Sequence, residues 1–499
     1  MLGRRSFILF LSKMLTAALA YVGLKLIATY MDTDAYGTIS AALALVATFN
    51  AVSDLGFGSA HVKRISEGCD PDKCISTYAF IKIVLTAAMV VLILSSMFIY
   101  REVMGKEITD TGTDIIMLFI LYQVLYDLSS IATTTFQARL EMAKMPLVTL
   151  ADPLIRVPLV AFVALNRMGV MELSVAYMFG AVAVFATSVY LIFREKVRWT
   201  RPVLFRSYLT FALPLMVITL VSAGSANADR LLITFFWNPD DVGLYAAPAV
   251  FLGVFATIST AVSTLTFPSF SKLHEEGNLR QIRALSTEAE RYIAMIGLPI
   301  TILLIMFPYE VCSILLDEKY YDSGKALGIM AVTTFITMIN AVHSSQIVAV
   351  GRPDISARIT IITVVINVSL MLCLIPGFGL GLSFVGAALA LLFGNIISFV
   401  LVRYSVHRLT GTGTNPRLCL HLVAGAASAL TLYLLSTVAS ISGWITLGVF
   451  TAASFGIFLA VLTALREFTR KDVDFFLSLV NVREMASYIR EELRGEKKG

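Results

Sequence analysis

Several basic residues stand inside long apolar stretches of this 499-residue chain, and they are its first candidates for chemistry. They are Lys13, Lys25, Lys82, Arg156 and Arg230. A lone cation at the centre of a bilayer costs about 2.5–3.5 kcal/mol on insertion scales. Such residues persist where they face a water-filled cavity, pair with an acid or extend to the interface. In a cavity, ammonium and guanidinium groups suit an anionic ligand, above all a phosphate, whose oxygens match the guanidinium fork.

Arg156 lies at the middle of its apolar stretch, far from both expected interfaces. Asp152 lies one helical turn before it, so an ion pair at i,i+4 is the alternative to a ligand-binding role. Pro153 and Pro158 flank the position, and each removes a backbone N–H. Irregular backbone at membrane depth is tolerated beside protein or a cavity, so the pattern favours a substrate-binding cation at Arg156.

Lys25, Arg230 and Lys82 are further candidates for cations of a substrate cavity. Lys25 lies in the outer third of the first apolar stretch, where snorkelling to the interface is the alternative. Arg230 follows Asp229, and adjacent side chains point about 100° apart on a helix. One of the two can therefore face a cavity while the other bonds a neighbouring helix. Lys82 and Lys13 lie near the expected cytoplasmic ends of their helices, so we expect both to snorkel, with a cavity role for Lys82 as the alternative.

Acidic and amide side chains inside the apolar stretches are candidates for structural or coupling roles. The acids are Asp152, Asp229, Asp54 and Asp127. The second half of the chain carries Asn340, His343, Gln346, Asn367 and Asn395, for which we expect interhelical hydrogen bonds. Asp229 with Asn367 and Asn395 is the alternative, a cation site. We expect no metal site, because Cys69 and Cys74 lack the further ligands that a structural zinc ion needs.

The elements that position these residues are long apolar segments. Hydrophobic residues make up 57% of the chain and charged residues 15%, against about 25% charged in soluble proteins. Blocks of roughly 20 apolar residues span a bilayer as helices. We expect an all-α integral membrane protein whose transmembrane helices are 7–30, 35–60, 77–100, 113–136, 146–165, 171–193, 209–236, 243–270, 290–316, 325–350, 355–375, 383–405, 418–439 and 443–465. The last seven of these fourteen are expected to carry no charged residue away from their ends.

Lysine and arginine residues of the loops predict the orientation, because short cytoplasmic loops are enriched in them. With the N-terminus inside, most loop cations fall on the inner side, among them the cluster from Arg194 to Arg206. The outer loops hold few, such as Arg101 and Lys319. The pattern indicates an even number of spans and a multi-pass protein of the plasma membrane with both termini cytoplasmic.

An internal repeat divides the chain. The segment YMDTDAYGTISAALAL aligns with FWNPDDVGLYAAPAVF, which pairs Gly37 with Gly243. The segment FQARLEMAKMP aligns with SQIVAVGRP at nearly the same offset, so each repeat contains six helices. Transporters built from parallel repeats hold their site between the halves. We predict two six-helix lobes at 1–206 and 207–407, two further helices at 408–465 and a cytoplasmic amphipathic tail at 466–499.

Motifs of common enzyme classes are missing from the sequence. It holds no Walker A, GxSxG or HExxH pattern, and its five histidines do not cluster. A membrane-embedded glycan polymerase or ligase would need a sizeable external loop for its acceptor, and none is expected. We therefore expect a transporter and not an enzyme, without a bound cofactor, and with Na+ or H+ as candidate coupling ions.

The order and spacing of several loose motifs resemble those of a known family. They are YGTISAAL near the first hairpin, DLGFGSA closing the second span, FALPLM opening the seventh, NADRLLITFF followed by DDVGLY, and EKYYDSGKALGIM before the tenth. The chain resembles the O-antigen-flippase-like polysaccharide flippases of the multidrug/oligosaccharidyl-lipid/polysaccharide exporter superfamily. The resemblance implies fourteen helices, two lobes around a central cavity, and a lipid tail held with help from the last two helices. It also implies that cavity cations, by position Arg156, Lys25 and Arg230, receive the diphosphate and sugar.

The expected function is to carry a polyprenyl-(di)phosphate-linked oligosaccharide from the cytoplasmic to the outer leaflet by alternating access, for cell-surface polysaccharide or glycoconjugate synthesis. A multidrug or cation antiporter of the same superfamily is one alternative, although buried bases are at least as numerous as buried acids. A membrane glycan polymerase or ligase is another. Expected partners are the lipid-linked substrate, membrane lipids and glycan-synthesis membrane proteins, with the chain acting as a monomer that binds no nucleic acid. The glycan, the lipid and the bacterial or archaeal host stay open.

Overall fold

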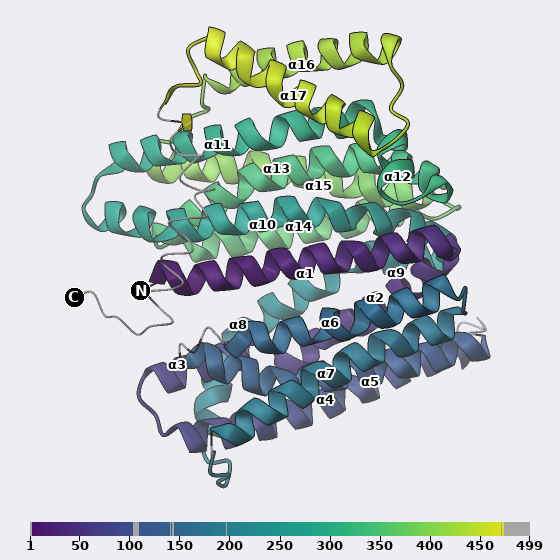
Figure 1. The fold of residues 1–499 in the computed structure, drawn as a ribbon. Coiled ribbons are helices and arrows are strands. Elements are labelled where there is room, and N and C mark those ends of the chain that lie inside the picture. The colour runs from purple at the N-terminus through teal and green to yellow at the C-terminus, as the bar shows by residue number, and fades with distance from the viewer. Residues whose placement is uncertain are drawn as a thin grey trace.

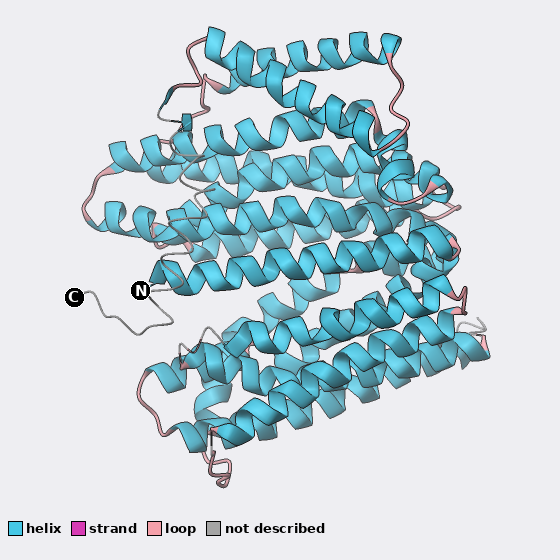
Figure 2. Ribbon diagram, in the orientation of Figure 1, coloured by secondary structure: helices cyan, strands magenta, loops and turns pink. Residues whose placement is uncertain are grey.

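The computed structural model consists of helices joined by short loops (Figures 1 and 2). It describes residues 2–102, 109–139, 141, 144–195, 197–470 and 472–473, and no strand occurs among them. The first helices are α1 (Leu2–Tyr30), α2 (Thr33–Asp54), α3 (Phe57–Ser66), α4 (Pro71–Glu102), α5 (Asp110–Ala138), α6 (Lys144–Leu165), α7 (Val170–Arg194), α8 (Phe205–Ala226) and α9 (Ala228–Phe236). They are followed by α10 (Pro239–Glu275), α11 (Leu279–Met306), α12 (Pro308–Leu315), the 3-10 helix η1 (Glu318–Ser323), α13 (Gly324–Ala349), α14 (Pro353–Leu374), α15 (Ser383–Thr410), α16 (Leu418–Val438) and α17 (Trp444–Ala464).

Each of the fourteen expected spans corresponds to one helix or to two consecutive helices, so the predicted all-α membrane fold is confirmed. Twelve helices of the described chain are long and apolar enough to cross a membrane. The other two expected spans correspond to α1 and to the pair α8 and α9. Three spans divide, at Leu55 and Gly56, at Asn227 and at Phe307.

Two helix groups form a lower and an upper half in Figure 1. The first lobe contains α2 to α7, and the second lobe contains α10 to α15. The pair α16 and α17 packs on the outer side of the second lobe against α11. Helix α1 lies between the lobes and contacts α6 and α10, whereas α8 contacts α2 and α3 on one side and α14 on the other. The predicted domain boundaries remain predictions.

The two segments aligned as repeats meet where α2 crosses α10, at the end of the bundle opposite the N-terminus (Figure 1). A Cβ at Gly37 would overlap the carbonyl of Pro239. A Cβ at Gly243 would overlap the carbonyl of Thr33. The Thr33 hydroxyl also donates to the Asp240 carboxylate across the crossing. Thr33 and Pro239 each begin their helix, so the crossing is nearly symmetric and joins the lobes by backbone contact.

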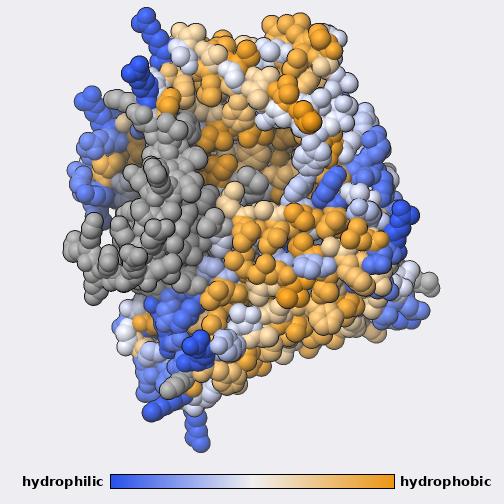
Figure 3. Space-filling model, viewed as in Figure 1, coloured by the Kyte–Doolittle hydropathy of each residue, from blue (hydrophilic) through white to orange (hydrophobic). Residues whose placement is uncertain are grey.

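Apolar side chains cover the flanks of the bundle, and hydrophilic residues gather at its two ends (Figure 3). Large exposed hydrophobic residues occur along α4, α14 and α16, for example Phe98, Val365 and Leu430. A soluble protein rarely exposes an apolar surface of this extent, so the distribution fits a bilayer around the flanks. Figure 3 also shows a recess with an apolar floor in the upper half.

Two helices of the second lobe are longer than the hydropathy predicts. Helix α11 begins at Leu279, ahead of the expected start at 290, and α15 ends at Thr410, beyond the expected end at 405. Glu290 and Arg403 therefore lie inside helices, and their side chains are 1% and 12% exposed. The prediction that the last seven spans carry no charge away from their ends is wrong for this reason.

The predicted amphipathic tail lies outside the described residues from 474 onward. The segment just before it folds back on α11, where Glu467 and Asp472 pair with Arg291. Burial acts to raise the pKa of Asp472, but hydrogen bonds from Thr469 and the charge of Arg291 outweigh it and hold that pKa below its ordinary value. The start of the tail is thus tied to the second lobe by charge.

Candidate functional site

Arg156 and Asp152 form a bidentate ion pair at the middle of α6. Arg156 donates from Nε to both carboxylate oxygens (3.0 and 3.2 Å) and from Nη2 to Oδ2 (2.9 Å). The i,i+4 spacing predicts this pairing, which holds the guanidinium in one orientation. Pro153 and Pro158 both lie inside the helix, as the sequence indicates. A substrate contact of Arg156 remains a prediction.

Two residues of α7 pack closely against this pair. The Tyr177 ring centroid lies 4.6 Å from the Arg156 guanidinium carbon, a cation–π contact worth about 0.5–2 kcal/mol depending on desolvation. A Cβ at Gly180 would overlap Asp152 Oδ1 and lie 3.1 Å from the Arg156 Cβ. Helices α6 and α7 approach this closely because position 180 carries no side chain.

Arg230 lies in the first turn of α9, after the break at Asn227 that separates α9 from α8. The Asp229 carboxylate accepts from the Tyr245 hydroxyl (2.7 Å) and from the Arg230 backbone N–H (2.8 Å). No ion pair between the two side chains is seen in the described part of the chain, which agrees with their 100° separation. The free N–H groups of a helix start favour anions, and broken helices place such starts at transporter sites.

Two of the four predicted cavity cations are carried or covered by helices that pack on α2, whose start forms the junction of the lobes. Helix α9, which carries Arg230, contacts α2. Helix α7, whose Tyr177 ring covers the Arg156 guanidinium, also contacts α2. One arginine thus comes from the first lobe and the other from the segment that leads into the second lobe. A ligand shared by the two arginines remains a prediction.

Lys25 of α1 bonds to backbone carbonyls at the end of α12. Its ammonium donates to the carbonyls of Ile314 (3.2 Å) and Leu316. The Tyr21 hydroxyl, one turn earlier, donates to the Leu315 carbonyl (2.9 Å). A helix end leaves such carbonyls without intrahelical partners, and its dipole favours a cation there. In this conformation Lys25 ties α1 to the second lobe, and its predicted cavity role remains a prediction.

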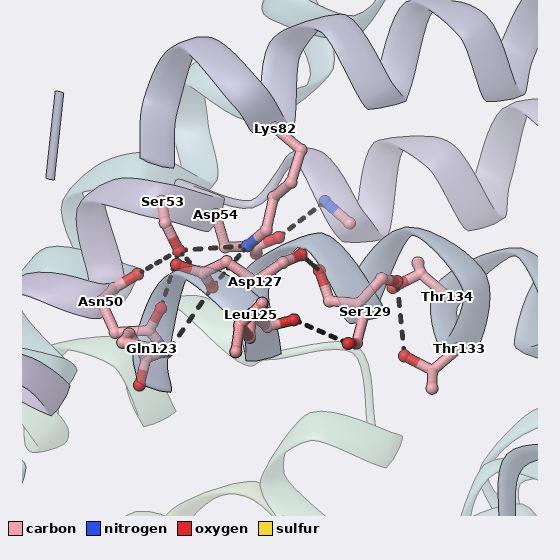
Figure 4. Close-up of polar contacts among 12 residues, drawn as sticks. Asn50, Ser53, Asp54, Lys82, Gln123, Leu125, Asp127, Ser129, Thr133 and Thr134 are labelled. Carbon is pink, nitrogen blue, oxygen red and sulfur yellow. Dashed lines mark hydrogen bonds and ion pairs between the residues drawn. The ribbon is translucent and has the colours of Figure 1, made fainter. Parts of the chain in front are cut away.

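Lys82 and Asp127 form a second buried ion pair, inside the first lobe (Figure 4). Lys82 Nζ lies 3.0 Å from Asp127 Oδ1, and both side chains are 4% exposed. The Ser53 hydroxyl accepts from Lys82 (3.0 Å) and lies 2.9 Å from the carboxylate, to which Gln123 also donates (3.5 Å). The expectation that Lys82 snorkels is wrong, because its amine turns inward to an acid of α5, whereas Lys13 is exposed.

Asp54 stabilises the break in the second span. Leu55 and Gly56 both adopt left-handed backbone (φ 47° and 84°) between α2 and α3. The Asp54 carboxylate accepts from the backbone N–H groups of Gly56 (3.2 Å) and Gly58 (3.1 Å). These are N–H groups that a helix start leaves without partners. These Asp54 bonds therefore serve its own backbone.

The predicted cation site of Asp229, Asn367 and Asn395 is not assembled by the contacts of the described residues. Asn367 packs on Gly394 of α15, and its Oδ1 is buried without a hydrogen-bond partner in the described structure. Asn395 bonds within its own helix and to Thr337 of α13. Over the described ranges, no three metal-ligating side chains gather. The cation site remains a prediction.

A third buried charge cluster lies in the second lobe, and the sequence does not reveal it as a unit. Glu290 Oε1 of α11 accepts from His343 Nε2 of α13 (2.7 Å) and from Arg403 Nη2 of α15. Ser286 and Gln346 extend the cluster with a hydrogen bond of 2.9 Å. The sequence indicates part of this cluster, because Ser286 and Glu290 lie one turn apart and share a helix face. Residue spacing does not predict that α11, α13 and α15 meet at this point.

A pocket of about 610 Å³ lies between α10 and α13. It is lined by Ser259, Thr260, Ser263, Phe267, Pro268 and Ser345, together with an alanine. Hydroxyl groups beside an aromatic ring suit a polar ligand with apolar faces. The pocket lining carries no charge, so an anionic part of a ligand would bind elsewhere.

Comparison with known proteins identifies relatives of the sequence. Residues 26–325 match the family described as "Polysaccharide biosynthesis protein". The probable low-salt glycan biosynthesis flippase Agl15 of Haloferax volcanii is 21% identical over 402 residues, which are 80% of this chain and 82% of that protein. The membrane protein MJ1068 of Methanocaldococcus jannaschii is 28% identical over 222 residues, 43% of this chain and 42% of its own length. The chain thus matches less than half of the latter.

Solved structures share the fold at low sequence identity. The lipid II flippase MurJ in an inward closed conformation has a TM-score of 0.75 at 15% identity, covering 92% of this chain and 98% of that one. An inward-facing MATE family transporter of the MOP superfamily has a TM-score of 0.65 at 14% identity, covering 80% and 96%. An outward-facing conformation of a MATE family transporter reaches 0.51.

Proposed function

This chain belongs to the polysaccharide biosynthesis protein family, and we propose that it is a flippase that carries a polyprenyl-(di)phosphate-linked oligosaccharide from the cytoplasmic to the outer leaflet by alternating access. The lipid would then serve cell-surface polysaccharide or glycoconjugate synthesis. The relative named as a glycan biosynthesis flippase supports the proposal, since the alignment covers 80% of this chain and 82% of that protein.

The observation that carries the proposal is the pair of arginines at the lobe junction. Arg230 lies on α9, and Arg156 lies under Tyr177 of α7, and both α9 and α7 pack against α2 at the junction. A diphosphate bound between two guanidinium groups would bond to both, and low local dielectric would strengthen the attraction. Separation of the lobes would then part the two arginines and weaken their hold, which is what release into the other leaflet requires.

The crossing of α2 and α10 supports alternating access. It closes the bundle at the end opposite the N-terminus, through Gly37 and Gly243. The higher similarity to inward-facing than to outward-facing transporters agrees with closure at that end. Transport would open this crossing and close the opposite end in turn.

The remaining parts of the substrate have surfaces of matching chemistry. The uncharged hydroxyl-bearing pocket between α10 and α13 suits the oligosaccharide. The apolar recess of the upper half, near α16 and α17, suits the polyprenyl chain (Figure 3). The diphosphate would bind at the arginines.

We infer further that the chain is a transporter without catalytic activity, with both termini on the cytoplasmic side of the plasma membrane. The excess of lysine and arginine in the loops on the same side of the membrane as the N-terminus supports this orientation. We propose that it acts as a monomer beside the membrane proteins that build the glycan. Na+ or H+ is the candidate coupling ion, with Asp229, Asn367 and Asn395 as the candidate cation ligands.

Leaflet transfer of a fluorescent polyprenyl-diphosphate oligosaccharide in proteoliposomes tests the function. We expect transfer by wild type and a loss of at least tenfold in Arg156→Ala, because the variant loses one of the two phosphate partners. Arg101→Ala, a change at an exposed arginine beside Glu102, is the matched control and is expected to transfer normally. Folding of each variant is checked by its thermal unfolding midpoint.

Two other outcomes have definite meanings. Transfer that survives in a folded Arg156→Ala variant would keep the flippase and reduce Arg156 to the partner of Asp152. If wild type transfers no such lipid but exports a small cationic dye, the flippase proposal fails and the antiporter function of the same superfamily replaces it.

A further inference from the structure

The buried cluster around His343 contains enough hydrogen bonds to assign its protons one by one. A hydroxyl group carries one proton, a backbone carbonyl only accepts, and a charged imidazole carries a proton on both nitrogens. Protons can be placed by following the bonds outward from a group whose role is known. Here that group is the backbone carbonyl of Val406 in α15.

The first links of this chain set the orientation of Gln346. The Val406 carbonyl accepts from the Thr410 hydroxyl (2.9 Å), which uses the Thr410 proton. The Thr412 hydroxyl must then donate to Thr410 in their contact of 2.8 Å. Both threonine oxygens therefore accept from the Gln346 amide nitrogen, at 2.9 and 3.0 Å. The amide oxygen of Gln346 is left facing Ser286.

The next links assign both nitrogens of His343. The Ser286 hydroxyl donates its proton to Gln346 Oε1 (2.9 Å). His343 Nδ1 lies 3.3 Å from the same Ser286 oxygen, so Nδ1 must supply the proton of that contact. On the other side of the ring, Nε2 lies 2.7 Å from the acceptor Glu290 Oε1 and also donates. A ring that donates from both nitrogens is an imidazolium.

We propose that His343, held between Ser286 and Glu290, is a proton-binding site of the second lobe that is occupied in this conformation. The site is enclosed, since the side chains of His343 and Glu290 are 0% and 1% exposed. A buried cation requires a nearby anion, and the Glu290 carboxylate supplies it.

The charges at the site make this proton exchangeable. Arg403 donates to the same Glu290 oxygen as His343, so one carboxylate serves two cations. The protonated cluster carries one net positive charge, and like charges repel strongly where water is excluded. Loss of the His343 proton to water would remove this repulsion and leave the Glu290–Arg403 pair neutral.

Further charged groups near the ring come from few elements. On α11, Arg283 lies one turn before Ser286, and its guanidinium approaches position 411 at the end of α15. Helix α10 packs on α13 but carries no ionisable residue between 246 and 271. Helix α14 carries Asp354, Arg358 and Cys373, and none of these has a described contact with the cluster. Glu290 is therefore the anion that faces His343 in the described structure.

Buried polar atoms of Glu290 and Arg403 allow the cluster a second arrangement of hydrogen bonds. Glu290 Oε2 and the Nε and Nη1 groups of Arg403 are buried without hydrogen-bond partners in the described structure. Once His343 is neutral, Arg403 can bind Glu290 through both oxygens, and Ser286 can turn its proton toward Nδ1. That turn breaks the Ser286–Gln346 bond, which links α11 to α13. Proton loss would thus loosen the packing of this part of the lobe.

The change of packing offers a route from proton binding to transport. If the proton leaves in one conformation and returns in the other, the second lobe is coupled to a proton gradient. This coupling rests on the proposed flippase function, whereas the proton on His343 does not.

His61, a buried histidine of the first lobe, provides a comparison. Its ring nitrogens lie 3.0 Å from the Thr135 hydroxyl and 2.9 Å from the Tyr208 hydroxyl, and no carboxylate bonds to the ring in the described structure. A buried imidazolium without a nearby anion is costly, so we expect His61 to be neutral.

Solid-state NMR of the full chain in lipid bilayers at neutral pH tests the proton site directly. His343 precedes Ser344, and no other histidine precedes a serine, so carbonyl-13C histidine with amide-15N serine identifies its ring without a substitution. We expect both His343 ring nitrogens at the 15N shift of an imidazolium, and His61 in a neutral tautomer. A neutral His343 ring would overturn the proposal.

A variant tests the role of the counter-ion. Glu290→Gln keeps the side-chain size but removes the anion, so the fraction of protonated His343 should fall at least tenfold. Glu288→Gln, at an exposed position of the same helix, is the matched control and should leave His343 protonated. Full protonation of His343 in Glu290→Gln would overturn the assignment of Glu290 as its partner.

The pH dependence of leaflet transfer separates the two proposals. Between pH 6 and pH 8 we expect a several-fold change in wild-type transfer and no such change in His343→Gln. A wild-type rate that is independent of pH would overturn coupling through this site. If wild type transfers no lipid-linked oligosaccharide at any pH, the flippase proposal fails, and the NMR result still decides whether His343 binds a proton.

Discussion

The Lys82–Asp127 pair is enclosed on all sides by the first lobe, since both side chains are 4% exposed. Removal of one member leaves the other buried and unpaired, at a cost of about 3–5 kcal/mol, whereas replacement of both by apolar residues costs little. We expect Asp127→Leu and Lys82→Met each to lower the unfolding midpoint strongly and the double variant to regain most of it. The four proteins are compared by thermal unfolding in one detergent. A double variant less stable than either single one would contradict this account.

Gly180 sets how closely α7 approaches the Asp152–Arg156 pair. A Cβ at this position would overlap Asp152 Oδ1, so Gly180→Ala must displace α7 or break the bidentate bond. Overpacking of this kind costs about 1–3 kcal/mol. We expect Gly180→Ala to lower the unfolding midpoint. Gly456→Ala is the matched control, because a Cβ there meets nothing within 4 Å, and it should be neutral or slightly stabilising. Equal effects of the two substitutions would count against the close contact.

The buried charges differ in how far the sequence reveals them. The Asp152–Arg156 pair is predictable, because its members lie one turn apart on one helix. The partner of Lys82 lies on another helix, so hydropathy alone suggests snorkelling, and the sequence does not indicate Asp127. Both partners of Glu290, His343 and Arg403, lie on other helices, and Arg403 lies more than a hundred residues away. Pairs that depend on which helices meet need the three-dimensional fold.

At the scale of elements, the crossing of α2 and α10 depends on the absence of two side chains. Gly37→Ala must push the Pro239 carbonyl away, which separates the lobes at this end. We expect the variant to populate a conformation open at the crossing, seen as a longer spin-label distance between the starts of α2 and α10. Gly253→Ala, where a Cβ on α10 meets nothing within 4 Å, is the control. An unchanged spin-label distance in Gly37→Ala would show that the crossing accommodates the added methyl group by local shifts and does not open.

The helices themselves are largely predictable, and their interruptions are not. Apolar blocks of about 20 residues locate the helices of all fourteen expected spans, of which twelve are long and apolar enough to cross a membrane, because the bilayer selects length and composition. The break at Leu55 requires left-handed backbone at a leucine, which the capping bonds of Asp54 to Gly56 and Gly58 help to stabilise. The extension of α11 to Leu279 is missed because polar residues of its first turns lower the hydropathy there.

At the scale of the whole molecule, the aligned repeats explain why two distant segments form the contact between lobes. Gly37 and Gly243 occupy equivalent repeat positions and meet at the same crossing. Related helices placed about a common axis can close one end of the bundle and then the other. The buried clusters lie within single lobes, so each lobe can move as a unit without breaking them, whereas the bonds of Lys25 to α12 must adapt as α1 moves.

A covalent lock at the crossing tests this motion in the intact protein. The Thr33 hydroxyl donates to the Asp240 carboxylate, so the side chains of these two positions meet across the crossing. In the Thr33→Cys/Asp240→Cys variant, we expect oxidation to stop leaflet transfer and a reductant to restore it, because the oxidised crossing cannot open. Each single variant, treated in the same way, controls for reaction of the five native cysteines. Transfer that continues in fully crosslinked protein would exclude opening at this crossing and require the substrate to leave by another path.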